Sequence, residues 1–376
     1  MKKNFFIMLL FIFLFEIYCV QVFSMGKRSN THNEVVIGMI TPLSGDVADL
    51  GKEMLVSGQI MAEKINKTTQ KFSFKIIPRD DQMSAAAAAT AAKGLILQDN
   101  AKVIIPAGMS SVAKGQIEAL KGKNIPVITP TATATDLTED RDYVFRVIPT
   151  NGAQGKALAN FALNQLKLKK AAILFQQDDY SKDLKEAFEK KYIEGGGKID
   201  LIIGFESDET DFRTQLDLVK KSGTNLLICP AQHVQIARLL VRSRSLGIDI
   251  PICGGDTAYT EKLLTAAGNS AEGFYLTGPD IDIENPTPEL SEFINIYYKK
   301  TGKKPGIYAC YTYDTIGLIA DIVNRKPKGT DQLISKLMSL DNYMGITGLI
   351  KFDKDGNVEK NYKIYKIENH EFKQIN

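Results

Sequence analysis

The chain has 376 residues, of which 44% are hydrophobic and 24% are charged, and its formal net charge is +3. This length is typical of two or three domains, and the composition excludes an intrinsically disordered chain and a bundle of membrane helices. The small net charge and the absence of a dense Lys/Arg cluster indicate that neither nucleic acid nor an anionic membrane surface is a partner.

The first predicted element is an export signal at residues 1–24. Lys2 and Lys3 form its positive start, and the run FFIMLLFIFLF forms its apolar core. This core is shorter than the roughly 20 residues that span a bilayer, which favours a cleaved signal over an uncleaved anchor. A lipid-modified Cys19 is a further alternative, but Tyr18 is larger than the small residue that precedes the cysteine in lipoprotein signals. No later run reaches transmembrane length, so we predict an exported, soluble mature chain.

After the signal, the hydrophobic pattern alternates regularly between strand and helix. Strand-like runs are expected at 35–40, 72–77, 103–105 and 127–128. Helical segments are expected between and after them, at about 47–65, 82–98 and 111–121.

A second alternating series begins near Gly152. Its strands are expected at 171–175, 199–205, 225–229 and 250–253. Its helices are expected at 154–166, 181–193, 211–221 and 232–245. Two successive strand–helix series predict two lobes, each with a mostly parallel sheet and helices on both faces.

The end of the chain departs from this alternation. Three helices are expected at 288–300, 307–323 and 330–339. The following segment, 346–367, is predicted to form a hairpin that turns at Asp355-Gly356. The stretch from Asp353 superficially resembles a calcium loop, but its twelfth position is Ile364, which cannot coordinate a cation, so we expect a plain turn there.

Signatures of catalysis and of metal binding are largely missing from the sequence. The chain has only three histidines, at positions 32, 233 and 370, and His233 is expected to begin a helix in a solvated or capping role. There is no G-x-S-x-G elbow, phosphate-binding loop, H-E-x-x-H motif or dinucleotide fingerprint. We therefore predict a protein that is not an enzyme and uses no cofactor or metal ion.

Three cysteines remain after the signal: Cys229, Cys253 and Cys310. An exported chain permits disulfides, and Cys229 and Cys253 could lie on neighbouring strands. None of the three belongs to a C-x-x-C motif, so we favour three buried free thiols.

Hydroxyl-rich loops follow successive strands of the first series, at 41–45, 106–111 and 129–135. Ser110 and Ser111 lie at a helix N-terminus, where free N–H groups and the helix dipole favour a carboxylate. A plain N-cap is the alternative for each serine. Because the carboxyl ends of parallel strands meet at one edge of a sheet, the loops together predict a site for a small polar ligand.

Polar residues also follow the strands of the second series, at 176–180, 230–232 and 254–256. Asp256 ends a buried strand and follows two glycines that would admit a close ligand. It is a candidate partner for an ammonium group, and a solvated or capping acid is the alternative.

With these residues in view, the chain resembles the periplasmic solute-binding proteins for branched-chain amino acids, the type I two-lobed receptors of ATP-driven importers. The resemblance covers nearly all of residues 34–368. It rests on the following motifs, in this order: IGMITPLSGDVADLG, IIPRDDQMSAAAAATAAKGLILQDNAKVII, VITPTATATDLT, VFRVIPTNGAQG, SAEGFYLT and MGITGLIKFDKDGNV.

The resemblance implies roles for individual residues by position. Ser110 would hold the α-carboxylate of the ligand through its hydroxyl. Thr131, through its backbone, and Thr133, through its hydroxyl and N–H, would grip the carboxylate and the ammonium group. Asp256 would pair with the ammonium group, and Tyr180 would close over the ligand from the second lobe.

The chain departs from the family pattern at several of these places. Gln232 stands where well-known members have a tyrosine, and Leu50 stands where they have another aromatic residue. Asp256 is one methylene shorter than the usual Glu, and Met109 replaces a cysteine, so the small disulfide of the family is absent. Leucine, isoleucine or valine is the first expectation for the ligand, and a more polar amino acid or a small amide is the alternative.

We therefore predict an α/β protein with the type I periplasmic-binding-protein fold, in which two Rossmann-like lobes with parallel sheets are joined by a hinge of three crossovers. The N-terminal lobe would comprise 34–150 plus 280–345. The second lobe would comprise 151–279 plus 346–376. Closure of the hinge would bring Tyr180, Gln232 and Asp256 onto a ligand held by the first lobe.

The predicted function is that of a monomeric, periplasmic solute-binding protein that delivers an amino acid to the membrane permease of an ABC importer. A sensor module that is not coupled to transport is one alternative. An exported hydrolase with Ser110 as nucleophile is another, but no histidine is placed to act as its base.

Overall fold

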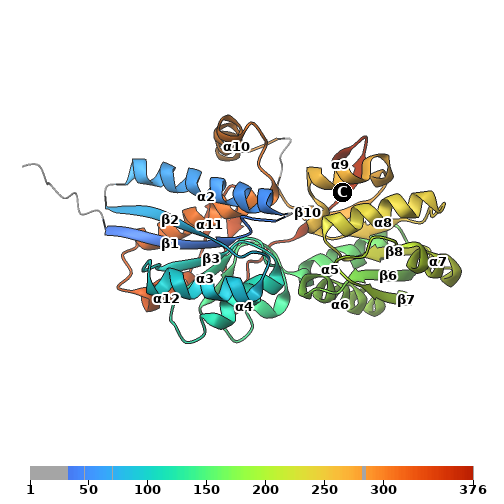
Figure 1. Cartoon of the computed structure of the whole chain (residues 1–376), viewed down its shortest axis with the longest axis horizontal. Coiled ribbons are helices and arrows are strands. Elements are labelled where there is room, and N and C mark those ends of the chain that lie inside the picture. Colours follow the sequence, from blue (N-terminus) through green and yellow to red (C-terminus); the bar gives the residue numbers. More distant parts are fainter. Residues whose placement is uncertain (1–32, 46, 70, 282–284, 376) are drawn as a thin grey trace, which may run out of the picture.

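A computed structural model describes residues 33–375, with the exception of 46, 70 and 282–284. The predicted export signal at 1–24 and Cys19 lie outside the described residues. The chain forms two lobes side by side, each built on its own sheet (Figure 1).

The first lobe contains a five-stranded, fully parallel sheet in the order β2-β1-β3-β4-β5. Its strands are β1 (Asn33–Thr41), β2 (Phe72–Asp80), β3 (Val103–Pro106), β4 (Val127–Thr129) and β5 (Val144–Arg146). The last six residues of β1 and all residues of β3, β4 and β5 are buried, because helices cover both faces of the sheet.

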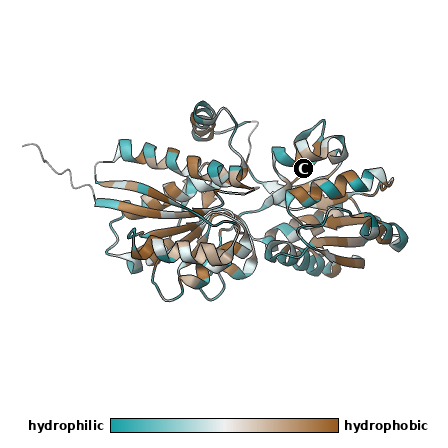
Figure 2. Cartoon of the chain, viewed as in Figure 1, coloured by the Kyte–Doolittle hydropathy of each residue, from teal (hydrophilic) through white to brown (hydrophobic). Residues whose placement is uncertain are grey.

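One face of this sheet packs against α2 (Ala48–Thr68), α11 (Ile307–Asn324) and α12 (Thr330–Met338). The other face packs against α3 (Ala85–Leu97) and α4 (Ser110–Ala119). A further helix, α10 (Pro288–Thr301), packs on α2 and α11. The strands consist mostly of hydrophobic residues, whereas hydrophilic residues are concentrated on the helices around them (Figure 2).

The second lobe contains a seven-stranded mixed sheet in the order β14-β13-β10-β9-β8-β6-β7. Its strands are β6 (Lys170–Gln176), β7 (Lys198–Phe205), β8 (Leu226–Cys229), β9 (Ile252–Gly254), β10 (Tyr275–Pro279), β13 (Tyr362–Glu368) and β14 (Glu371–Ile375). Strands β6 to β10 are parallel, and β13 runs antiparallel to both of its neighbours.

Helices again cover both faces of the second sheet. They are α5 (Asn151–Asn160) and α6 (Asp179–Glu194) on one face, and α7 (Arg213–Ser222), α8 (His233–Ser245) and α9 (Glu261–Ala267) on the other. The remaining short elements are η1 (Thr135–Leu137), the π-helical turn η2 (Phe161–Gln165), η3 (Asp256–Ala258), η4 (Gly268–Ala271) and the hairpin of β11 (Tyr343–Gly345) and β12 (Gly348–Ile350).

The predicted alternation of strands and helices is confirmed in both lobes. Four strands were not predicted, namely β5, β10, β11 and β14. Strand β5 has only three residues, and β10 contains Gly278 and Pro279, so neither carries a strong strand pattern.

The predicted hairpin over 346–367 is wrong in its arms. Its turn is present, with Gly356 at φ +79° and an antiparallel bridge between Phe352 and Val358. The second arm, however, becomes β13 and pairs with β10 and β14 of the other lobe. Alternating residues predict a strand but do not specify its partner.

The lobes are connected at three places, near 148–151, 279–281 and 359–361. The core of the first lobe includes Ile350, Phe352 and Val358. The sequence-based prediction instead placed 346–358 in the second lobe. Because these apolar side chains are buried against the first sheet, we propose that the last crossover follows Val358.

Cys229, Cys253 and Cys310 are buried free thiols, as predicted, and the first two lie on the neighbouring strands β8 and β9. Within the described part of the chain, no helix has both the length and the apolar character needed to cross a membrane.

Candidate functional site

Ser110 begins α4 at the carboxyl edge of the first sheet and is buried. Its hydroxyl oxygen accepts hydrogen bonds from the backbone N–H groups of Thr133 and Ala134, each at 3.2 Å. These two bonds occupy the lone pairs of the hydroxyl oxygen, so its hydrogen can be donated to a ligand oxygen. The predicted proximity of Ser110 and Thr133 is therefore confirmed.

Two threonine hydroxyls hold the loop after β4 against the loop after β3. Thr131 Oγ1 donates to the carbonyl of Gly108 at 2.8 Å, and Thr129 Oγ1 donates to the carbonyl of Pro106 at 2.9 Å. The side chain of Thr131 is thus used within the loop, which agrees with a role for its backbone in binding.

Arg146, at the end of β5, lies fully buried behind the same loop. Its guanidinium donates to the carbonyls of Ala132 (3.4 Å), Ala134 (2.7 Å) and Thr135 (3.1 Å) and to Thr138 Oγ1 (3.3 Å). Among the described residues, none of its hydrogen bonds goes to a carboxylate. Burial lowers the pKa of Arg146 to about 10, so the group stays positively charged at neutral pH.

Asp256 begins η3 at the carboxyl edge of the second sheet and is 1% exposed. Its Oδ1 accepts hydrogen bonds from Tyr180 Oη (3.0 Å) and Gln154 Nε2 (3.1 Å), and its Oδ2 accepts one from Tyr362 Oη (3.1 Å). A carboxylate offers about four acceptor positions, so one position remains on Oδ2. Burial raises the pKa of Asp256 to about 6, and the three hydrogen bonds partly oppose this rise.

Gln154 and Tyr362 were missed by the sequence analysis. Gln154 Oε1 accepts from the Asp256 N–H (3.0 Å) and from Thr277 Oγ1 (2.7 Å), so both ends of this amide hold the edge of the second sheet. Tyr362 also approaches the carbonyl of Pro149 at 3.1 Å, in the first crossover. In a sequence, a glutamine in the first turn of a helix cannot be distinguished from a surface residue, and a tyrosine in a strand cannot be distinguished from a core residue. The sequence therefore contained no sign that Gln154 and Tyr362 contact Asp256.

A chain of hydrogen bonds connects the two edges of the site. The carbonyl of Thr133 accepts from the Asn151 N–H at 2.9 Å, and Asn151 Oδ1 accepts from Gln154 Nε2 at 3.0 Å. The same nitrogen of Gln154 donates to Asp256. The loop of the first lobe and the acid of the second lobe therefore lie close together across the first crossover.

The two glycines before Asp256 have a different role from the one predicted. A Cβ atom at Gly255 would overlap the hydroxyl of Tyr180, and one at Gly254 would lie 2.6 Å from the ring of Phe274. The missing side chains at Gly254 and Gly255 make room for Phe274 and Tyr180. Packing within the protein is therefore enough to explain both glycines.

Gln232 follows Ala231, whose carbonyl accepts a hydrogen bond at 2.6 Å from Thr257 Oγ1, next to Asp256. Its N–H donates to Gln176 Oε1 at 3.1 Å and its Nε2 to Asp178 Oδ2 at 3.4 Å, whereas no hydrogen bond joins it to Tyr180 or Asp256. A further aromatic residue, Tyr308 at the start of α11, was missed. Burial, and after it the negative charge of Asp256, raises the pKa of Tyr308 well above its ordinary value.

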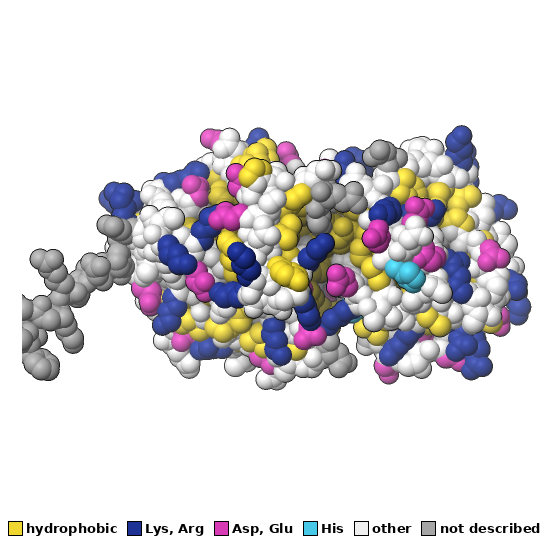
Figure 3. Space-filling model, turned by 90° about the horizontal axis from the view of Figure 1, so that it is seen from above, with side chains coloured by type: hydrophobic (Ala, Val, Ile, Leu, Met, Phe, Trp, Pro, Cys, Tyr) yellow, Lys and Arg dark blue, Asp and Glu magenta, His cyan; other side chains and the backbone are white. Residues whose placement is uncertain are grey.

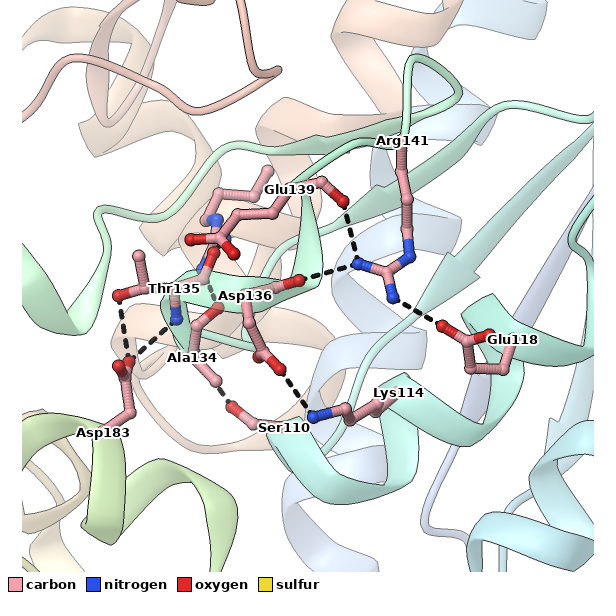
Figure 4. Close-up of polar contacts among 10 residues, drawn as sticks. Ser110, Lys114, Glu118, Ala134, Thr135, Asp136, Glu139, Arg141 and Asp183 are labelled. Carbon is pink, nitrogen blue, oxygen red and sulfur yellow. Dashed lines mark hydrogen bonds and ion pairs between the residues drawn. The ribbon is translucent and has the colours of Figure 1, made fainter.

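Two contacts join the lobes beside the site. Asp183 of α6 accepts hydrogen bonds from Thr135 of the first lobe (Figure 4). Lys262 of α9 forms an ion pair with Asp49 of α2 at 3.6 Å. Seen from above, acidic and basic side chains gather where the lobes meet (Figure 3).

Comparisons with known proteins agree with this architecture. The sequence profile of the family described as periplasmic binding protein matches residues 34–371. The leucine-, isoleucine-, valine-, threonine-, and alanine-binding protein of Pseudomonas aeruginosa is 23% identical over 339 residues, which cover 89% of this chain and 90% of that protein.

Two solved structures have the same fold. A leucine-binding protein from Thermotoga maritima superposes with a TM-score of 0.85 at 24% identity, covering 91% of this chain and 98% of that one. A solute-binding protein of an ABC transporter from R. palustris, in complex with benzoate, superposes with a TM-score of 0.80 at 19% identity, covering 91% and 96%. These likenesses confirm the predicted two-lobed α/β fold, and at such identities they leave the ligand open.

Proposed function

The chain belongs to the periplasmic binding protein family, and from this premise we propose that it captures an amino acid of the branched-chain type between its lobes. The predicted family is thereby confirmed, whereas the ligand is a proposal. It is supported by the opposite charges at the two edges of the site and by the amino-acid ligands named for its relative and for one of the solved structures.

The main support is a pair of buried charges of opposite sign, neither of which has a charged partner in direct contact. Arg146 lies behind the first-lobe loop, and Asp256 lies on the second-lobe edge. Buried charges are stable only when they are paired and hydrogen-bonded. An amino-acid zwitterion carries the two complementary charges, with its carboxylate toward the first lobe and its ammonium group toward the second.

In the proposed complex, the carboxylate accepts hydrogen bonds from the hydroxyls of Ser110 and Thr133, with the backbone of Thr131 beside it, whereas the Thr133 N–H, also expected to bind the ligand, donates to Ser110 Oγ. The ammonium group donates to the open acceptor position on Asp256. Tyr180, which already donates to Asp256, closes over the ligand. We propose that Gln232 and Tyr308 contact the side chain of the ligand.

We propose that the protein binds its ligand without reacting with it. The hydroxyl oxygen of Ser110 accepts two N–H groups, and no base contacts it within the described part of the chain. The exported protein would act as a monomer in the periplasm and deliver its ligand to the permease of an ABC importer. A receptor that senses the ligand without transport is the alternative, and uptake of ligand by the reconstituted importer separates the two.

Matched ligands test the zwitterion directly. Leucine carries both charges, leucinamide lacks the carboxylate, and 4-methyl-2-oxopentanoate lacks the ammonium group. In a thermal-shift screen, a ligand at about 100 times its Kd stabilises a protein by about 2.7 kcal/mol. We expect leucine, isoleucine or valine to stabilise the protein and both leucine analogues to bind at least about tenfold more weakly, since each strands a buried charge.

The opposite results would contradict the proposal. Equal or tighter binding of 4-methyl-2-oxopentanoate or of benzoate would show that the site takes an anion and that Asp256 has no ammonium partner. Binding of a polar amino acid or an amide in place of leucine would correct the ligand while keeping the zwitterion. A lack of response to every amino acid would overturn the proposed function.

A further inference from the structure

The peptide group between Ala134 and Thr135 lies between a buried guanidinium and a partly buried carboxylate. Its carbonyl accepts a hydrogen bond from Arg146 Nη1 at 2.7 Å. Its N–H donates to Asp183 Oδ2 at 2.8 Å, and Thr135 Oγ1 donates to the same oxygen at 3.0 Å (Figure 4).

The direction of these bonds follows from the geometry of the peptide bond. In a planar trans peptide the C=O and N–H point in opposite directions. When Arg146 draws the carbonyls of Ala132 and Ala134 toward itself, the N–H groups of Thr133 and Thr135 must point away from it. The first of these N–H groups meets Ser110, and the second meets Asp183.

The contact with Asp183 joins the two lobes. Thr135 follows β4 of the first lobe, and Asp183 lies on α6 of the second. Burial raises the pKa of Asp183, and the hydrogen bonds from Thr135 and the charge of Arg146 act in the opposite direction. The carboxylate and the guanidinium thus bind opposite sides of one peptide group.

Asp183 has no evident role in forming its own helix. The N-terminus of α6 is capped by Asp178, which accepts from the Ser181 N–H at 2.7 Å. Asp183 lies in the second turn of the helix, where a carboxylate no longer caps free N–H groups. Its position is explained by the contact with the other lobe.

We propose that Asp183 is a positioning residue that locks the ligand-binding loop when the lobes close. Its carboxylate accepts from the N–H and hydroxyl of Thr135, on the opposite side of the peptide group that Arg146 holds, and so keeps the N–H groups at Ser110 in place. This inference rests on the proposed function for its effect on ligand release, while the contact between Asp183 and Thr135 rests on their hydrogen bonds.

Asp183→Asn and Asp136→Asn form a matched pair of variants on either side of Thr135. Asp136 belongs to the same loop, but its carboxylate meets Lys114 at 2.5 Å within the first lobe, and both side chains are partly exposed. Both changes keep the shape of the side chain and remove its charge, so a general effect of charge loss would appear in both.

The first measurement is hydrogen exchange of the Thr135 amide in the ligand-free protein. We expect exchange at least about tenfold faster in D183N, because a charge-assisted hydrogen bond has been removed, and unchanged exchange in D136N. The second measurement is stopped-flow kinetics with leucine. We expect release to accelerate at least about tenfold in D183N while association stays within about twofold of the parent.

Unchanged Thr135 exchange in D183N, or equal effects in D136N, would overturn the inference. Faster exchange with unchanged leucine release would also overturn it, because the contact would then have no effect on the ligand. If the parent protein does not bind leucine, the proposed function fails for that ligand. The exchange of Thr135 still decides whether Asp183 holds the loop.

Discussion

The two edges of the site are built in different ways. The first-lobe edge consists of loops from neighbouring strands, and its donors are backbone N–H groups together with the hydroxyl of Ser110. The second-lobe edge consists of one carboxylate, Asp256, surrounded by Gln154, Tyr180 and Tyr362, which are far apart in the sequence.

This difference predicts how each edge responds to change. Backbone donors persist when a side chain is replaced, so the first edge should lose only part of its binding energy in any single variant. The second edge depends on a single ionisable group, so it should be sensitive both to substitution and to pH.

The largest effect is expected from Asp256→Ala. This change removes the partner of the ammonium group and takes the Asp256 acceptor from the hydroxyl of Tyr180, while Tyr362 keeps the Pro149 carbonyl. Leucine binding should weaken by roughly 2–5 kcal/mol, as observed when one partner of a buried, hydrogen-bonded charge pair is removed. Calorimetry measures this loss, and a variant that binds leucine as tightly as the parent would show that Asp256 is misassigned.

The pH dependence of the second edge should be nearly as large. Burial raises the pKa of Asp256 from 3.8 to about 6, so the folded, ligand-free protein binds this proton more tightly than the unfolded chain. Its contribution to stability is fully present below about pH 4 and is lost as the pH rises through about 6; the difference corresponds to about 3 kcal/mol.

Leucine affinity should change in the opposite direction, increasing as Asp256 ionises. The checks are thermal unfolding and calorimetry between about pH 4 and 8, in the parent and in Asp256→Asn. The difference between the pH profiles of the parent and of Asp256→Asn gives the contribution of Asp256 alone. Equal pH profiles in the two proteins would contradict the assignment of Asp256 as the titrating group.

A smaller effect is expected at the first edge from Ser110→Ala. The variant loses the hydroxyl that would donate to the ligand carboxylate, but the N–H groups of Thr133 and Ala134 remain. Leucine binding should weaken by about 1.5–3 kcal/mol, the value of a hydrogen bond to a charged group. The neighbouring Ser111→Ala is the control and should change binding by less than about 0.5 kcal/mol. Equal losses in the two variants would exclude a specific role for Ser110.

The smallest effect is expected from Lys262→Ala, which removes the second contact between the lobes. Lys262 and Asp49 are 3.6 Å apart, and their side chains are 43% and 70% exposed. An exposed ion pair contributes no more than about 1 kcal/mol and is screened by salt. A double-mutant cycle with Asp49→Ala at low and high salt measures it. A large, salt-independent coupling would show that this pair holds the lobes together more strongly than its exposure indicates.

Much of the first edge could be predicted from the sequence. Ser110, Thr131 and Thr133 lie in loops that directly follow apolar strands, and the carboxyl ends of parallel strands necessarily meet at one edge. Asp256 could be found by the same argument, since it directly follows β9. The role of Arg146 could not be predicted, because a charged residue in a short strand gives no sign that it is buried.

The sequence by itself determined the two alternating strand–helix series, the sheet edges on which binding residues lie, and the three buried cysteines, because periodicity and strand order act over short stretches of chain. Only the tertiary structure decided that β13 joins the second sheet, that Gln154 and Tyr362 surround Asp256, and that Asp183 meets Thr135 across the lobes. These contacts join residues up to 106 positions apart, as between Asp256 and Tyr362. Such partners depend on how the lobes pack, and no local pattern encodes that packing.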